Sequence, residues 1–170
     1  MKNVLLALFL TISFFTNAQE ALKYSDVVVV ENATQNQLFD RSKIWLTKTF
    51  KSAKDVLQSS DATAGQLIGK ALFNFSPKSF MGSEAIKGTI SYSIAIYSKD
   101  GKYKYVIEDF RHEKFGLLTT AEEGDFEMFG SSKGFRKKTW DDMKAQSEKE
   151  AKGLILSLKE AMAKKSDAEF

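Results

Sequence analysis

Cysteine is absent from this chain of 170 residues, and proline and histidine each occur once. Without cysteine the protein forms no disulfides, has no thiol nucleophile and lacks the sulfur ligands of structural zinc sites. It also has no lipidated cysteine with which to tether itself to a membrane. Because His112 is the only imidazole, we expect no transition-metal site and no metal-dependent cofactor.

Long apolar runs are absent except at the N-terminus, where residues 1–18 have the three parts of a cleavable signal peptide. Lys2 is the positive part, Val4 to Phe15 the apolar part, and Ala18 the small residue before the cleavage point. A membrane anchor and a buried helix are the alternatives, but a spanning helix needs about 20 apolar residues. We therefore predict export, with cleavage near Ala18, to the periplasm or the medium. The mature chain should have no transmembrane segment.

An excess of charge is also lacking. Without Lys2 the chain carries 24 basic and 22 acidic residues, which gives no steering field towards nucleic acid or an anionic membrane. Nucleic acid is therefore not an expected partner. The 152 mature residues suffice for one domain, and 14 Phe, 5 Tyr and 2 Trp predict an aromatic core.

Hydrophobic periodicity predicts an α+β domain. Thr34 and Gln37 form a capping box, so a helix should follow Thr34 with an apolar stripe from Leu38 to Phe50. A second helix should begin at Thr139 as its cap, and its Gly153 suggests a bend or close packing. The expected strands occupy 27–30, 56–61, 66–75, 87–98 and 102–110.

The last two strands form a hairpin closed by Asp100 and Gly101, a pair suited to a type I′ turn. This turn places Lys99 opposite Lys102 and, further along, Tyr92 opposite Asp109. Because successive side chains of a strand point to opposite faces, one face of the hairpin should be covered and the other largely exposed to solvent. The covered face comprises Ile90, Tyr92, Ile94, Ile96, Tyr103, Tyr105 and Ile107. The pattern favours an antiparallel sheet with both helices on one face.

Three segments resemble a known family: 44–56 with its Trp45 and Phe50, the glycine-flanked run 65–71, and Tyr103 to Tyr105 with Phe110. The chain is similar to a domain family of unknown function with a TBP-like fold (DUF4468), found in exported proteins of Bacteroidetes-type bacteria. The resemblance implies a curved antiparallel β-α-β(4)-α fold over 19–113. It implies no activity, and we expect residues 114–170 to complete the same domain.

Catalytic groups are scarce. His112 lies among acidic residues and could act as a general base, but a surface histidine is the simpler interpretation. The run Gly65 to Ala71 is too short for a phosphate loop and leads into a strand. The basic triplet Arg136 to Lys138 has too few charges to bind nucleic acid. We therefore predict that the protein is not an enzyme.

The glycine-punctuated, aromatic stretch 114–138 leaves two interpretations open. It completes the core, or it covers a cavity beneath the last helix, into which Tyr92, Tyr103 and Tyr105 would point as ligand-binding groups. Our first hypothesis is an exported, non-enzymatic domain that binds an envelope protein or glycan through its exposed sheet face. The alternative is a helix-grip carrier of a small apolar molecule.

Overall fold

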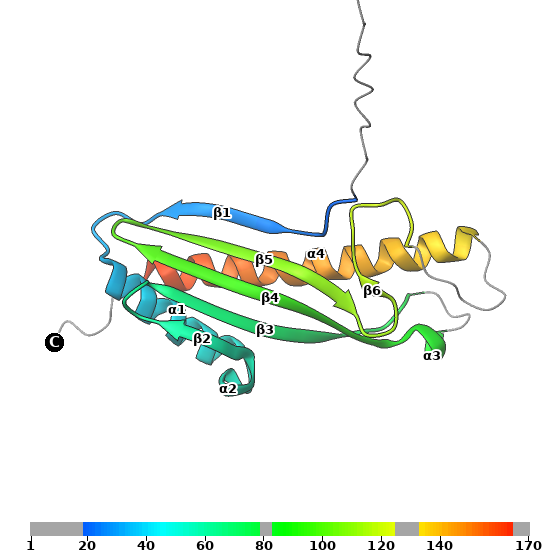
Figure 1. Ribbon diagram of the computed structural model, residues 1–170, viewed down its shortest axis with the longest axis horizontal. Helices are drawn as coiled ribbons and strands as arrows, with labels where there is room; N and C mark the ends of the chain where they lie inside the picture. The colour runs from blue at the N-terminus through cyan, green and yellow to red at the C-terminus, as the bar shows by residue number, and fades with distance from the viewer. Residues whose placement is uncertain (1–18, 79–82, 125–132, 165–170) are drawn as a thin grey trace, which may run out of the picture.

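The computed structural model describes residues 19–78, 83–124 and 133–164. Its centre is an antiparallel sheet of six strands with the order β1-β5-β4-β3-β2, and β6 pairs with the far end of β5 (Figure 1). The strands are β1 (Tyr24–Val29), β2 (Leu57–Asp61), β3 (Gln66–Phe75), β4 (Gly88–Lys99), β5 (Lys102–His112) and β6 (Gly116–Leu117).

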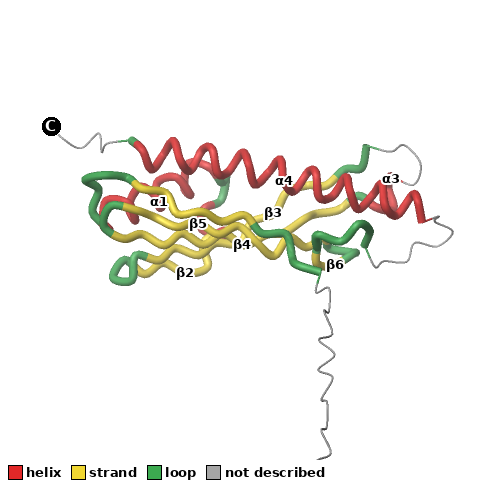
Figure 2. Tube along the Cα trace, turned by 90° about the horizontal axis from the view of Figure 1, so that it is seen from above, coloured by secondary structure: helices red, strands yellow, loops and turns green. Residues whose placement is uncertain are grey.

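Two long helices lie on one face of this sheet and leave the other face open (Figure 2). They are α1 (Gln35–Thr49) and α4 (Lys133–Ala163), and the short helices α2 (Ala53–Val56) and α3 (Ser83–Ile86) lie in connections. The predicted α+β class and the placement of both helices are confirmed. Within the described ranges no helix combines the length and apolar character needed to cross a bilayer.

Both helices and the inner sheet face share one core. The Thr34 capping box starts α1 as predicted, with the Thr34 side chain accepting from the Gln37 N–H and the Gln37 side chain from the Thr34 N–H. Trp45 Nε1 donates to the Ser157 hydroxyl of α4 at 3.0 Å, and Arg41 donates to the Met162 carbonyl at 2.8 Å. These bonds fix the C-terminal half of α4 against α1.

The β4–β5 hairpin has the predicted register next to its turn, where Lys99 pairs with Lys102. Further along, the predicted register is wrong. The sequence predicts Tyr92 opposite Asp109, but the pairing shifts by one residue between Ser91 and Ser93. Asp109 has a φ of 59°, in the left-handed region that non-glycine residues rarely adopt. This is a β-bulge, in which one strand contains an extra residue.

The bulge determines which side chains at the end of β5 face the core. Up to Ile107 the odd-numbered residues point inward, whereas beyond the bulge Phe110 and His112 are buried and Arg111 is exposed. The sequence-based placement of His112 on the surface is therefore wrong, because an alternation without a bulge puts it outside. Its side chain is 1% exposed.

Several element boundaries also differ from the prediction; β1, for example, begins at Tyr24 and not at Val27. Val56 ends α2, and the strand starts one residue later, at Leu57. Helix α4 begins at Lys133, so Thr139 is a buried residue within the helix and not its cap. No atom lies within 4 Å of a Cβ built on Gly153, so the predicted close packing there is wrong. The predicted signal peptide and residues 125–132 lie outside the described residues.

Candidate functional site

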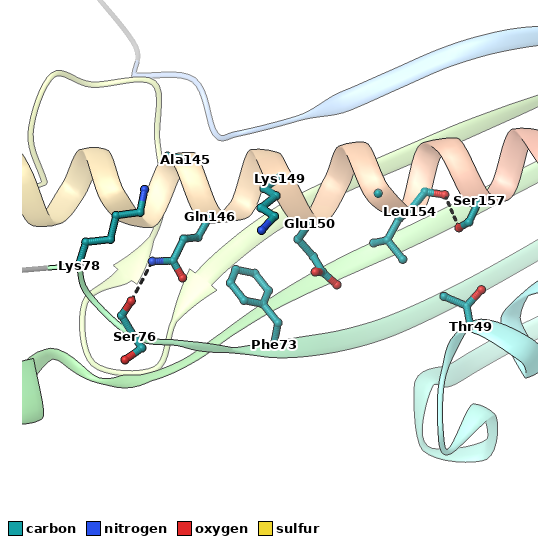
Figure 3. A pocket seen from close by; sticks show the side chains of 11 residues that line it. Thr49, Phe73, Ser76, Lys78, Ala145, Gln146, Lys149, Glu150, Leu154 and Ser157 are labelled. Carbon is teal, nitrogen blue, oxygen red and sulfur yellow. Dashed lines mark hydrogen bonds between the residues drawn. The ribbon is translucent and has the colours of Figure 1, made fainter.

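A groove of about 740 Å³ runs between α4 and β3 (Figure 3). Phe73 of β3 lies at its centre, Leu154 of α4 adds apolar surface, and Thr49 at the end of α1 lies at one side. The groove exists because α1 covers only one end of the sheet, whereas α4 runs along its length (Figure 1). Phe73 therefore stays half-buried, and Gly153 adds no side chain to fill the space.

Glu150 is the acidic group in this groove. Its Oε1 accepts a hydrogen bond from the Tyr92 hydroxyl at 3.0 Å, and the Tyr92 ring contacts Phe73 with centroids 6.2 Å apart. Burial raises the pKa of Tyr92 far above its usual value, and the Glu150 charge and hydrogen bond raise it further. Tyr92 is therefore a fixed donor and not a proton-transfer group.

The polar rim of the groove consists mainly of structural contacts. Gln146 donates to the Ser76 carbonyl at 2.9 Å and to Asp142 at 3.1 Å. The backbone N–H of Lys78 donates to Asp142 at 2.8 Å. These bonds attach the segment after β3 to α4 and define one end of the groove.

The three tyrosines predicted to bind a ligand lie beneath the helices. Tyr92, Tyr103 and Tyr105 are 1%, 1% and 5% exposed. Of the three, Tyr92 reaches the groove, through Glu150. Burial raises the pKa of Tyr103 to about 12, and its hydroxyl has no hydrogen-bond partner among the described residues. Lys159 Nζ lies 5.9 Å from the centre of the Tyr105 ring.

His112 is part of the aromatic core. Its ring stacks on Phe115 with centroids 4.7 Å apart and meets the edge of Phe75 at 5.5 Å. Nδ1 accepts from the Lys114 N–H at 3.2 Å, whereas Nε2 has no hydrogen-bond partner among the described residues. Burial lowers the pKa of His112, which favours the neutral ring. A buried imidazole without an orienting carboxylate is poorly placed to act as a general base.

The open face of the sheet carries a second groove, of about 540 Å³. Its apolar surface comes from Val27, Tyr97 and Val106, and exposed Val29 lies beside it, opposite Lys102. The charged residues lining this groove are Lys23, Lys99, Lys102, Lys104 and Glu108.

The lysines of this outer groove differ in their partners. Lys23 forms an ion pair with Glu108 at 2.7 Å, and that hydrogen bond raises the Lys23 pKa. Lys99, Lys102 and Lys104 have no acidic side chain within 4.0 Å in the described ranges. All three lysines belong to the β4–β5 hairpin, and Lys99 lies directly opposite Lys102. The near-neutral net charge of the chain gave no indication of this lysine cluster, although the predicted hairpin register already paired Lys99 with Lys102.

The two grooves differ in the chemistry of their side chains. No group of three His, Asp or Glu side chains is placed to bind a metal ion within the described part of the chain. The α4 groove has a carboxylate beside an aromatic ring, whereas the outer groove has ammonium groups beside an aromatic ring. Both arrangements suit non-covalent binding.

The sequence family described as a domain of unknown function (DUF4468) with TBP-like fold matches residues 24–113. The crystal structure of a TBP-like protein from Parabacteroides distasonis ATCC 8503 is 16% identical, with a TM-score of 0.54 over 82% of this chain and 93% of that chain. A DUF4468 family protein from Bacteroides ovatus ATCC 8483 is 15% identical, with a TM-score of 0.58 over 86% and 89%. No curated protein matches. At these identities the two structures support the fold alone.

Proposed function

Since the chain belongs to the DUF4468 family, a family of unknown function with a TBP-like fold, we propose its function from its surfaces: a non-enzymatic binding domain of the cell envelope. The outer groove carries this proposal. It combines exposed apolar side chains, Tyr97 among them, with three lysines that lack acidic partners. Exposed apolar surface bordered by polar groups is typical of interaction sites.

Two further observations support binding without catalysis. His112, the one candidate base, is enclosed by Phe75 and Phe115. Within the described part of the chain no helix covers the outer face of the sheet, so a large ligand can reach it (Figure 2). The N-terminal pattern of residues 1–18 is the basis for placing the protein in the envelope.

Site-specific photo-cross-linking tests this proposal. A photoreactive phenylalanine analogue replaces Tyr97 in the outer groove or Ile44 on α1, where the exposed fractions are 38% and 54%. Both mature proteins are irradiated with envelope extract. We expect discrete adducts from position 97 and none of them from position 44. Equal adducts from both positions, or none from position 97, would refute the outer face as the binding surface.

The α4 groove supports a second candidate function, carriage of a small apolar molecule. Its volume of about 740 Å³ lies within the usual range for ligand sites. Native mass spectrometry of freshly purified protein should show a bound small molecule. Gly153→Leu, whose side chain enters open space beside the groove, should abolish that signal. An identical spectrum for the variant and the parent would argue against carriage.

A further inference from the structure

The lysines on the outer sheet face form an unbalanced charge cluster. Four lysines and one glutamate line the outer groove, which gives it a local charge of +3. Without Lys2 the chain has 24 basic and 22 acidic residues, a net charge of +2, so the charges outside this groove sum to −1. The positive excess of the protein thus lies on this surface.

This cluster reduces the stability of the fold that carries it. Lys99 and Lys102 are direct cross-strand partners, and like charges opposite each other destabilise a strand pair. The nearest carboxylate along the chain, Asp100, forms no ion pair with either lysine within 4.0 Å in the described residues, and its Oδ1 accepts from the Gln35 N–H at 2.7 Å at the start of α1. An anionic ligand would relieve the repulsion between the two lysines.

The outer face also limits the kind of anion that fits. The backbone groups of β4 and β5 are paired within the sheet, so a ligand above this face gains no main-chain hydrogen bonds and must contact side chains. Those side chains are a partly exposed aromatic ring, Tyr97, the aliphatic Val27, and ammonium groups. A flat aromatic ring suits the C–H face of a sugar, and ammonium point charges suit carboxylates repeated along a polymer.

We propose that the outer groove binds an acidic polysaccharide, with Tyr97 against a sugar ring and Lys99, Lys102 and Lys104 on its carboxylates. This inference rests on the proposed function of the same face and names its ligand class. Lys104 pairs with Tyr97 across β4 and β5, so it lies beside the stacking ring. Lys99 and Lys102 extend the basic surface to the hairpin end.

Binding of an oligogalacturonate probe tests the proposal by NMR titration at low salt, with a neutral dextran oligomer for comparison. We expect the probe to shift the backbone signals of β4 and β5, and dextran to shift none. The triple variant Lys99→Gln, Lys102→Gln, Lys104→Gln should bind at least tenfold more weakly. The control variant Lys48→Gln, Lys51→Gln, Lys54→Gln, equal in charge but on α1, α2 and the turn between them, should bind within about twofold of the parent. Equal losses in both variants, or no binding by the parent, would overturn the proposal.

A second probe separates a polysaccharide from an acidic peptide. Tyr97→Ala should weaken oligogalacturonate binding severalfold and leave the weaker binding of oligoglutamate unchanged. If oligoglutamate binds as tightly as oligogalacturonate, or if Tyr97→Ala affects neither, the ligand is not a polysaccharide. Such a result leaves the cross-linking test from position 97 unaffected, so failure of this inference is distinguishable from failure of the proposed function.

Discussion

A single residue, Asp109, determines the environment of the only histidine. Its left-handed backbone creates the β5 bulge, and the bulge turns His112 inward between Phe75 and Phe115. Burial there lowers the pKa of His112, so the folded protein favours the neutral ring more strongly than the unfolded chain does. This difference links the stability of the fold to pH.

The stability of the protein should fall as the pH drops through the ordinary His pKa of 6.5. Because the His112 pKa is lowered on folding, the unfolded state takes up the proton first, and stability is lost from pH 6.5 down to the lower folded value. The slope can reach about 1.4 kcal/mol per pH unit. His112→Phe keeps an aromatic ring in place and should remove this loss. Urea denaturation of the parent and of His112→Phe at pH 7 and pH 5 tests this prediction. If the unfolding free energy fell equally in both proteins, the interpretation would be contradicted.

At the scale of elements, the hairpin shows how far the sequence could predict the fold. The Asp100-Gly101 turn fixes the pairing near Lys99, and alternation assigns the inner face correctly as far as Ile107. The bulge was not predictable, since an aspartate such as Asp109 is a much weaker signal for a positive φ than a glycine. The start of α4 at Lys133 was also missed, because residues 133–138 contain a glycine, four basic residues and Phe135 as their one large apolar residue, which makes no apolar stripe.

The repulsion between Lys99 and Lys102 predicts that one substitution can stabilise the fold and weaken ligand binding at the same time. Lys102→Glu places opposite charges across β4 and β5 and should raise stability by about 0.2–1 kcal/mol at low salt. The same change should weaken oligogalacturonate binding. Lys104→Glu is the control, because its cross-strand neighbours, Tyr97 and Val27, are uncharged, so binding should fall without the same gain. An unchanged or lowered stability for Lys102→Glu would show that the lysine pair costs the fold nothing.

Gly153 in the middle of α4 lowers the stability of the helix, and a substitution can remove this effect. Gly153 is exposed and helical with open space around it, so Gly153→Ala should raise the unfolding free energy by about 1 kcal/mol. Gly134→Ala, equally free of contacts but in the first turn of the helix, should raise it less. Thermal denaturation of the two variants compares them. If Gly153→Ala destabilised the protein, the helix would need its glycine for a reason other than packing.

At the scale of the whole molecule, the core extends beyond the matched family region. Residues 24–113 contain β1 to β5 and α1, but α4 contributes a full row of buried side chains. This row comprises Trp140, Met143, Ser147, Ala151, Leu154, Leu158 and Met162. The sequence could predict this row from its helical spacing. A cavity beneath the last helix was one of two interpretations of the sequence, but the positions and linings of the two grooves could not be predicted, because they depend on how far α1 extends over the sheet and on which charges lack partners.

A chain that ends at Glu113 should therefore fail to fold. Without α4, much of the inner sheet face meets water, and the lost burial exceeds the usual stability of a small domain. We expect no cooperative thermal transition and strong binding of a hydrophobic dye. A chain that ends at Lys164 keeps all of α4 and should melt within a few degrees of the parent. Cooperative melting of the shorter chain would show that the sheet and α1 are sufficient.

The bond from Arg41 to the Met162 carbonyl spans 121 residues. Contacts between such distant parts of a chain form late, because the intervening segment must first be available. A ribosome has to release almost the whole polypeptide before the second long helix can close over the sheet. Under the proposed export, we expect closure of the core to wait until α4 has been synthesised.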